Sequence, residues 1–294
     1  LHDALPIYLT NLLLFGAAKR CQLQPIGWAK DQAGRMENVA NTGYVTRKAW
    51  IKQSAVYEME GPLLLDMFMQ GKLLLNQVDV RIKLTRSNNT FHLLSSGTNA
   101  VNGTVDIKKA YLKVKQVQVA ADRMRQIESG LALQNAVYPI QRTELYTYTI
   151  AQGLQSSIRE NLFHNRRPKM LTLAMVRNTA FNGTYATNPF RFPHYDLSTI
   201  GLYIDGKPIP HVPLTPDFDG GNYADVYRNL HRLVNLLNRD GDIGITKNEF
   251  ANGYTIFGYI LAQDGKAHGL TGQPLTHGNI RIELQFKQAL AAAI

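Results

Sequence analysis

Four oxygen-bearing side chains recur at the spacing of an EF-hand calcium loop. Asn238, Asp240 and Asp242 would fill loop positions 1, 3 and 5, and Glu249 would fill position 12. Position 6 holds Ile243, although the sharp turn of such a loop requires glycine there. A β-branched residue at positive φ is strongly disfavoured. We therefore predict an Asp/Gly turn over this stretch, with calcium binding as the lesser alternative.

No other group of reactive side chains in the sequence matches a catalytic or metal-binding motif. The eight histidines form neither His-x-His nor His-Glu-x-x-His, and G-x-S-x-G, P-loop and G-x-G-x-x-G sequences are absent. Cys21 is the single cysteine and has no histidine close in sequence, which favours an unreactive thiol. The sequence thus predicts no enzyme activity, no cofactor, no metal site and no intrachain disulfide.

Basic and aromatic residues alternate in two stretches of the second half. Such side chains can stack on and neutralise single-stranded nucleic acid, but aromatic residues and arginine are also enriched in protein interfaces. We favour the second interpretation and predict contacts between domains or subunits at Arg159, Phe163, Arg166, Arg167, Phe190, Phe192, His194 and Tyr195.

The composition is that of a globular protein with a basic surface. The 294 residues include 32 Lys and Arg against 22 Asp and Glu, which gives a formal charge of +10 and permits contact with an anionic partner. No apolar stretch of the sequence approaches the roughly 20 residues that a membrane-spanning helix needs. One cysteine and no visible secretory signal predict synthesis in a reducing compartment and no secretion.

Period-two alternation of apolar and polar residues is the main secondary-structure signal, and it indicates half-buried strands. The strands are expected at 78–85, 112–119, 145–150, 170–176, 200–204, 253–257 and 280–287, with a phase slip near 115–116. Asp205-Gly206 predicts a hairpin turn over 204–209. Helical periodicity appears at 120–135 and 223–237. This pattern predicts an all-β protein of two tandem antiparallel sandwich domains with short decorating helices.

Several blocks of sequence, in order, resemble one viral family. They include DMFMQGKLLLNQVDVRI at 66–82, NPFRFPHYD at 188–196, LYIDGKPIP at 202–210 and GNIRIELQF at 278–286. With FNG at 181–183, PDF at 216–218 and NGYT at 252–255, they resemble the major capsid protein of Maverick/Polinton elements and adintovirus-like DNA viruses. The resemblance covers nearly all of 8–290. After Phe257 this chain departs from the Asp-Leu-Thr-Pro-like stretch of the family.

The resemblance implies a double jelly roll with a truncated first domain. Residues 8–119 would be the later strands of the first jelly roll, 120–135 a connector helix and 136–294 the second jelly roll. Residues 1–7 read like a translated sequencing adapter, so we expect them to be foreign and the natural chain to start earlier.

The function implied by the resemblance is structural. Such subunits assemble as pseudo-hexameric homotrimers into an icosahedral shell around double-stranded DNA. Expected partners are further copies, minor capsid or penton proteins and packaged DNA, which a basic inner face would contact without sequence preference. The expected location is the virion capsid, after synthesis in the host cytoplasm or nucleus. The alternative is a β-sandwich module that binds a ligand or glycan.

Overall fold

The structure is a computed structural model. It describes residues 4–95 except 15 and 17–20, residues 103–262 except 165, 238 and 239, residue 265, and residues 277–294. The helices are α1 (Ala4–Leu14), η1 (Cys21–Ile26), α3 (Thr42–Trp50), η2 (Lys52–Ser54), η3 (Asp66–Phe68), α4 (Asn89–His92), α5 (Ala121–Leu133), α6 (Asn178–Asn182), α7 (Ala224–Leu233) and α8 (Lys247–Ala251). The strands are β1 (Ser156–Arg159), β2 (Met170–Ala174), β3 (Leu197–Ile204), β4 (Lys207–Pro208), β5 (Ile256–Ile260) and β6 (Ile280–Phe286).

The strands form two antiparallel sheets in the second half of the chain. The larger sheet has the order β1-β6-β3-β4, and the smaller one pairs β2 with β5. In β6 the alternation predicted from sequence is confirmed, because Ile280, Ile282, Leu284 and Phe286 are buried. The predicted hairpin is also confirmed: β3 pairs with β4 across Asp205 and Gly206, which both have positive φ.

Helix α7 covers the small sheet, and one stripe of its side chains enters the core. Val226, Leu230 and Leu233 are buried at helical spacing, as the apolar periodicity over 223–237 predicted. Asp225 in the first turn and Arg232 in the last turn both interact favourably with the helix dipole. The helix lies against β5 at Gly258, where a Cβ atom would stand 2.7 Å from Leu233 Cδ2.

This close approach predicts that Gly258→Ala destabilises the fold. The added methyl group has no space against Leu233, so α7 or β5 must shift, and overpacking of this kind costs about 1–3 kcal/mol. Urea unfolding should show this loss of unfolding free energy. Gly71→Ala is the matched control, because no atom lies within 4 Å of its Cβ position. Equal stability of the two variants would contradict close packing of α7 on β5.

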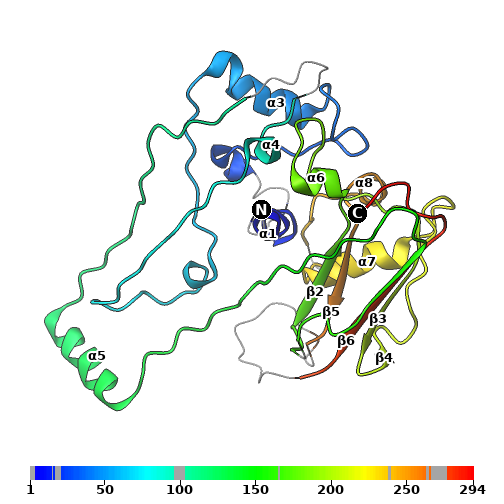
Figure 1. Ribbon diagram of the computed structural model, residues 1–294. Helices are drawn as coiled ribbons and strands as arrows, with labels where there is room; N and C mark the ends of the chain where they lie inside the picture. Colours follow the sequence, from blue (N-terminus) through cyan, green and yellow to red (C-terminus); the bar gives the residue numbers. More distant parts are fainter. Residues whose placement is uncertain are drawn as a thin grey trace.

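The all-β prediction is wrong. The described residues form a mixed helical and sheet structure with sheets of only four and two strands, which is not a double jelly roll. The stretches 78–85, 112–119 and 145–150 are drawn as extended chain without a strand partner (Figure 1). Period-two patterning indicates an extended segment with two unlike faces, but a strand also requires a neighbour to pair with. Among the described residues, 78–85 and 112–119 have no such neighbour, and within 145–150 Ile150 alone exchanges backbone hydrogen bonds, with Ile294.

The N-terminal segment packs onto the sheet-containing half. Leu5, Leu12 and Leu13 of α1 are buried in the same core as the strands. Residues 4–7, within the segment that resembles an adapter, belong to the first turns of this helix. No helix in the described ranges combines the length and apolar composition needed to cross a membrane. Helix α5 coincides with the helix predicted over 120–135 and lies at the end farthest from the sheets (Figure 1).

Candidate assembly surface

Residues 55–87 and 103–149 leave the packed half of the molecule and form what we call the arm (Figure 1). Within the described residues, no hydrogen bond between backbone groups falls in 70–87, 103–119 or 135–149. Each of these extended stretches therefore presents backbone N–H and C=O groups that another strand could pair with.

Large apolar side chains are exposed along these same stretches. The exposed side chains are Leu73, Val78, Val80, Leu84, Ile107, Tyr111, Leu112, Val114, Val117, Val119, Val137, Ile140 and Tyr148. Leu112 and Val114 alternate on one face, with 57% and 67% of their surfaces exposed. Single exposed apolar residues are common and need no explanation, whereas so many along the same stretches are typical of an interaction surface.

Helix α5 at the tip of the arm has no buried residue. Its apolar side chains Ile127, Leu131 and Leu133 are all exposed. Most helices in proteins are stabilised by packing of an apolar face, and 13 residues is marginal for an isolated helix. The tip of the arm therefore lacks the packing that would stabilise it in a single chain.

Among the described residues, the polar contacts that link the stretches of the arm are mostly solvent-exposed. Lys72 Nζ donates to the carbonyl of Val137 at 2.7 Å, and Lys113 forms an ion pair with Glu60 at 2.7 Å. The hydroxyl of Tyr138 accepts from the backbone N–H of Leu75 at 3.1 Å. Exposed ion pairs contribute about 0–1 kcal/mol each, so these contacts fix the arm weakly.

Four of the predicted interface residues, Phe190, Phe192, His194 and Tyr195, are buried or partly buried within the chain. The rings of the two phenylalanines lie against Tyr8 of the N-terminal segment. Phe190 stacks on Tyr8 of α1 with ring centroids 4.2 Å apart. Phe192 is 2% exposed, and its backbone N–H donates to the carbonyl of Gly253. Tyr195 is partly buried, and burial raises its pKa to about 12. These side chains join segments of one chain that are far apart in sequence.

His194 stacks on Phe218 at 4.2 Å, and its Nδ1 accepts a hydrogen bond from the backbone N–H of Asp196 at 2.9 Å. Burial lowers the pKa of His194 below its usual value. The carboxylate of Asp196 lies 3.2 Å from Nδ1 and raises the pKa by less. The folded protein therefore favours the neutral imidazole.

This predicts a contribution of His194 to acid sensitivity. The unfolded chain binds a proton near the usual pKa of about 6.5, which the folded state resists, so the free energy of unfolding should fall as the pH drops below that value. His194→Phe preserves the stack on Phe218 and should make the fall shallower. Urea unfolding of both proteins at about pH 7.5 and 5.5 measures the difference. An unchanged pH dependence would contradict the prediction.

The other four predicted residues lie between 159 and 167, shortly after the arm ends at residue 149. Arg159 Nη2 donates to the carbonyl of Thr149 at 3.1 Å, and Arg167 Nη2 donates to the carbonyl of Leu261 at 2.7 Å. Phe163 meets the ring of Tyr146 edge-on at 5.1 Å. Arg166 is exposed and bridges to His277. Arg159 and Arg167 thus bind backbone carbonyls within the chain, and Phe163 packs on another ring.

The side chains of the calcium-like loop have other partners. Glu249 forms a capping box with Thr246 at the start of α8 and an ion pair with Lys30 at 2.6 Å. Asp242 accepts from the backbone N–H of Gly244 at 2.7 Å. Ile243 is fully buried. Asn238 lies outside the described residues, and Asp240 is exposed. Within the described ranges, no three His, Cys, Asp or Glu residues converge as a metal site would require.

A buried polar cluster around Asp31 has no signal in the sequence. The Asp31 carboxylate accepts from Asn41 Nδ2 at 3.0 Å, from Arg47 Nη2 at 2.7 Å and from Asn188 Nδ2 at 2.9 Å. Its backbone carbonyl accepts from the hydroxyl of Tyr254 at 2.7 Å. The cluster ties the N-terminal segment to two loops of the sheet-containing half.

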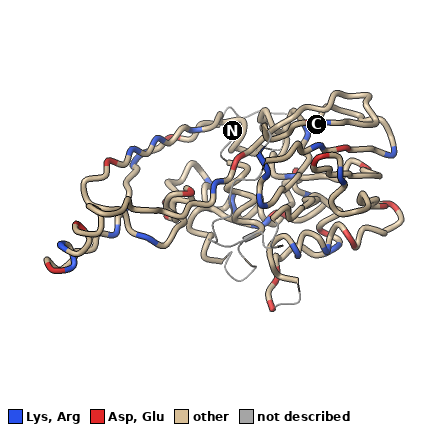
Figure 2. The backbone as a smooth tube through the Cα atoms, turned by 90° about the horizontal axis from the view of Figure 1, so that it is seen from below, with Lys and Arg blue, Asp and Glu red and all other residues tan. Residues whose placement is uncertain are grey.

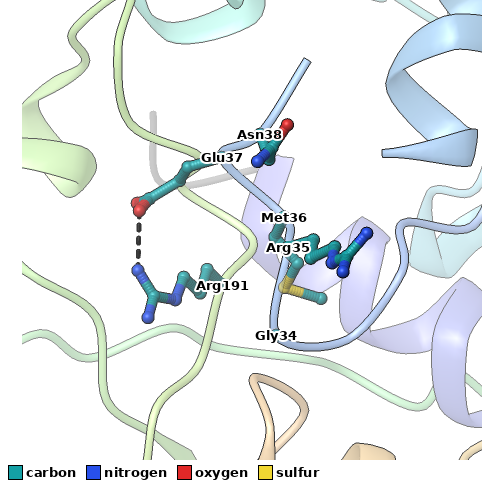
Figure 3. Close-up of a pocket in the computed structure, with 6 residues that line it drawn as sticks. All are labelled: Gly34, Arg35, Met36, Glu37, Asn38 and Arg191. Atoms are coloured by element: carbon teal, nitrogen blue, oxygen red, sulfur yellow. Dashed lines mark hydrogen bonds and ion pairs between the residues drawn. The ribbon is translucent and has the colours of Figure 1, made fainter. Parts of the chain in front are cut away.

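Two cavities open beside this cluster. One, of about 250 Å³, is lined by 34–38 and Arg191. Figure 3 shows Glu37 and Arg191 directed toward each other, 2.6 Å apart, while Arg35 points away. The other cavity, of about 390 Å³, is lined by Trp28, Lys30 and Trp50 together with neighbouring residues of η1 and α3.

The comparisons with known proteins identify a relative but no family. No protein-family model and no solved structure matches the chain. An uncharacterized protein of Caenorhabditis elegans is 24% identical over 292 residues, which is 96% of this chain and 66% of that protein. The chain therefore spans 66% of the length of this curated relative, whose description states no activity.

Proposed function

We propose that the protein is a structural subunit that self-associates through the arm, as a major capsid protein does. The observation that carries the proposal is the arm itself. Its extended stretches combine exposed apolar side chains with unpaired backbone groups among the described residues. A folded protein rarely leaves both in water, because each favours pairing with another chain.

A second copy of the chain is the partner that supplies matching chemistry. An added strand satisfies the orphan backbone groups, and alternate side chains of the two strands then pack face to face. Copies related by rotation can each give an arm and receive one, which closes a ring. A homotrimer is the building block that the resemblance to Maverick/Polinton capsid proteins implies, with the trimers tiling an icosahedral shell around double-stranded DNA.

The packed half of the molecule suits the role of a rigid body that carries the arm. Leu12 of α1, Leu230 of α7 and Phe286 of β6 share one core. The Asp31 cluster adds buried hydrogen bonds between segments 157 residues apart, Asp31 and Asn188. A shell requires subunits that keep one shape while their edges pair, and this division between body and arm supports that role.

The mass of the purified protein in solution tests the proposal. Light scattering should give a particle near three times 33.0 kDa, and larger assemblies should form as concentration and ionic strength change. A strict monomer at high concentration would overturn the proposal. Electron microscopy of the larger fraction would then separate closed shells from irregular aggregates, and only closed shells support a capsid.

The larger cavity supports a second candidate, a module that binds a ligand or glycan. Trp28 and Trp50 line the 390 Å³ space, and aromatic walls with a few polar groups are typical of small-molecule sites. These are the two tryptophans of the sequence, so selectively excited tryptophan fluorescence reports on this cavity. A saturable fluorescence change on titration with oligosaccharides, lost in Trp50→Ala, would support this candidate. No change would exclude it for those sugars.

A further inference from the structure

We propose that two stretches of the arm, 70–87 and 103–120, form a binding surface for the sugar–phosphate backbone of nucleic acid. The inference rests on the proposed function, because it assigns the contact between a capsid subunit and its packaged DNA to particular residues. Its evidence comes from charged side chains and the ring of Tyr111, whereas the test of self-association rests on Leu112 and Val114.

The positive charge of the protein is concentrated in these two stretches. They contain eight Lys and Arg residues and two Asp residues, a net charge of +6 out of +10 for the whole chain. The eight are Lys72, Arg81, Lys83, Arg86, Lys108, Lys109, Lys113 and Lys115. Figure 2 shows Lys and Arg recurring along the arm. The stretches make up about an eighth of the chain, so their net charge per residue is several times the average for the whole chain.

Four residues of the 103–120 stretch line up on one face. Lys109, Tyr111, Lys113 and Lys115 are alternate residues, which lie on the same side of an extended chain about 6.6 Å apart. The contacts agree with this placement: the ammonium groups of Lys109 and Lys113 lie 5.8 Å and 5.9 Å from the centre of the Tyr111 ring. Tyr111 is 64% exposed. The result is an aromatic platform flanked by cations.

Few of these charges are neutralised within the chain. Lys108 pairs with Asp106 and Lys113 with Glu60, both at exposed positions. Arg81, Lys83, Lys109 and Lys115 take part in none of the ion pairs formed between described residues. Uncompensated cations at regular intervals attract a polyanion, because binding releases its condensed counterions.

A nucleic acid matches this surface better than other polyanions. Phosphates repeat along the strand as the lysines repeat along the arm, and an exposed aromatic ring between cations can stack on a base. Exposed Leu112 and Val114 alternate with these residues and therefore face the opposite side. The arm can thus pair with another copy through one face and meet phosphates with the other.

Fluorescence anisotropy with labelled 30-nucleotide single-stranded DNA and the matching duplex tests the inference. Binding should weaken steeply between about 50 and 200 mM salt. The triple variant Lys109→Gln, Lys113→Gln, Lys115→Gln should bind at least tenfold more weakly. It should also reduce the slope of log affinity against log salt by about two to three, because each lost phosphate contact removes roughly one unit.

A control with the same loss of charge separates a site from general attraction. The triple variant Lys52→Gln, Lys207→Gln, Arg228→Gln removes three exposed cations outside the arm and should bind DNA almost as the parent does. Equal losses in the two triple variants would overturn the inference. Binding to vesicles with 30% phosphatidylserine is measured as a second control. Loss of vesicle binding with unchanged DNA binding in the arm variant would assign the surface to membranes and overturn the inference.

Light scattering of the same samples distinguishes this inference from the proposed function. Trimers that bind neither form of DNA would overturn the phosphate surface and leave self-assembly in place. Monomers that bind DNA through Lys109, Lys113 and Lys115 would support the phosphate surface and remove the capsid function. Trimers that lose DNA binding only in the arm variant are the result expected if both hold.

Discussion

Replacing Asp31 with alanine should lower the free energy of unfolding by about 3–5 kcal/mol, because it leaves two buried amide groups and the partly buried Arg47 guanidinium without their shared acceptor. The carboxylate accepts from Asn41, Arg47 and Asn188. Without it, two amide groups and one guanidinium group lose a shared acceptor in a site from which water is largely excluded. Removal of the acceptor lowers the free energy of unfolding by more than the hydrogen bonds themselves contribute, because the remaining donors stay buried without a partner.

Urea unfolding followed by circular dichroism measures this effect. Asp106→Ala is the matched control, because Asp106 also pairs with a cation, Lys108, but at an exposed position of the arm. It should change the free energy of unfolding by less than about 1 kcal/mol. If the two variants are equally stable, the Asp31 cluster does not hold the N-terminal segment to the sheets.

The parts of the fold that sequence could predict are those with a local signal. β6 was predictable because its apolar residues alternate over seven positions, and the β3–β4 hairpin because Asp205-Gly206 accepts positive φ at both turn positions. Helix α7 was predictable from one apolar stripe. In each case the neighbours in sequence carry the information that determines the structure.

The structure of the arm could not be predicted from local sequence patterns. The stretch 78–85 alternates as regularly as β6, yet it has no strand partner among the described residues. Periodicity specifies two unlike faces of an extended chain, whereas pairing depends on a second strand that the alternation does not identify. This difference accounts for the wrong all-β prediction.

The candidate sites depend on long-range contacts, which sequence patterns did not report. Asp31 and Asn188 are 157 residues apart and belong to no motif. Glu249 was singled out by the spacing of a calcium loop, but the structure gives it a capping box and Lys30 as partners. The alternation of lysines around Tyr111 is present in the sequence. Only the two ring contacts in the structure show that Lys109 and Lys113 lie on the same side of the chain as Tyr111.

Replacing Leu112 and Val114 with serine should convert the proposed trimer into a monomer. Both side chains are exposed in the single chain and would be buried when a second arm pairs with the first. Burial of one such side chain contributes about 1.5–3 kcal/mol, so the double variant forfeits roughly 3–6 kcal/mol at each interface. Each 1.4 kcal/mol is tenfold in affinity, which makes association about a hundredfold weaker or more.

The mass from light scattering should therefore fall from near three times 33.0 kDa to near 33.0 kDa at the same concentration. Val212→Ser provides the control, because Val212 is as exposed as Val114, at 66% against 67%, but lies outside the arm. It should leave the mass unchanged. Neither Leu112 nor Val114 is packed in the single chain, so the double variant should keep the unfolding free energy of the packed half. A lower particle mass would then reflect lost assembly and not unfolding. A double variant that retains the parent's mass would show that copies associate without the apolar face of the arm.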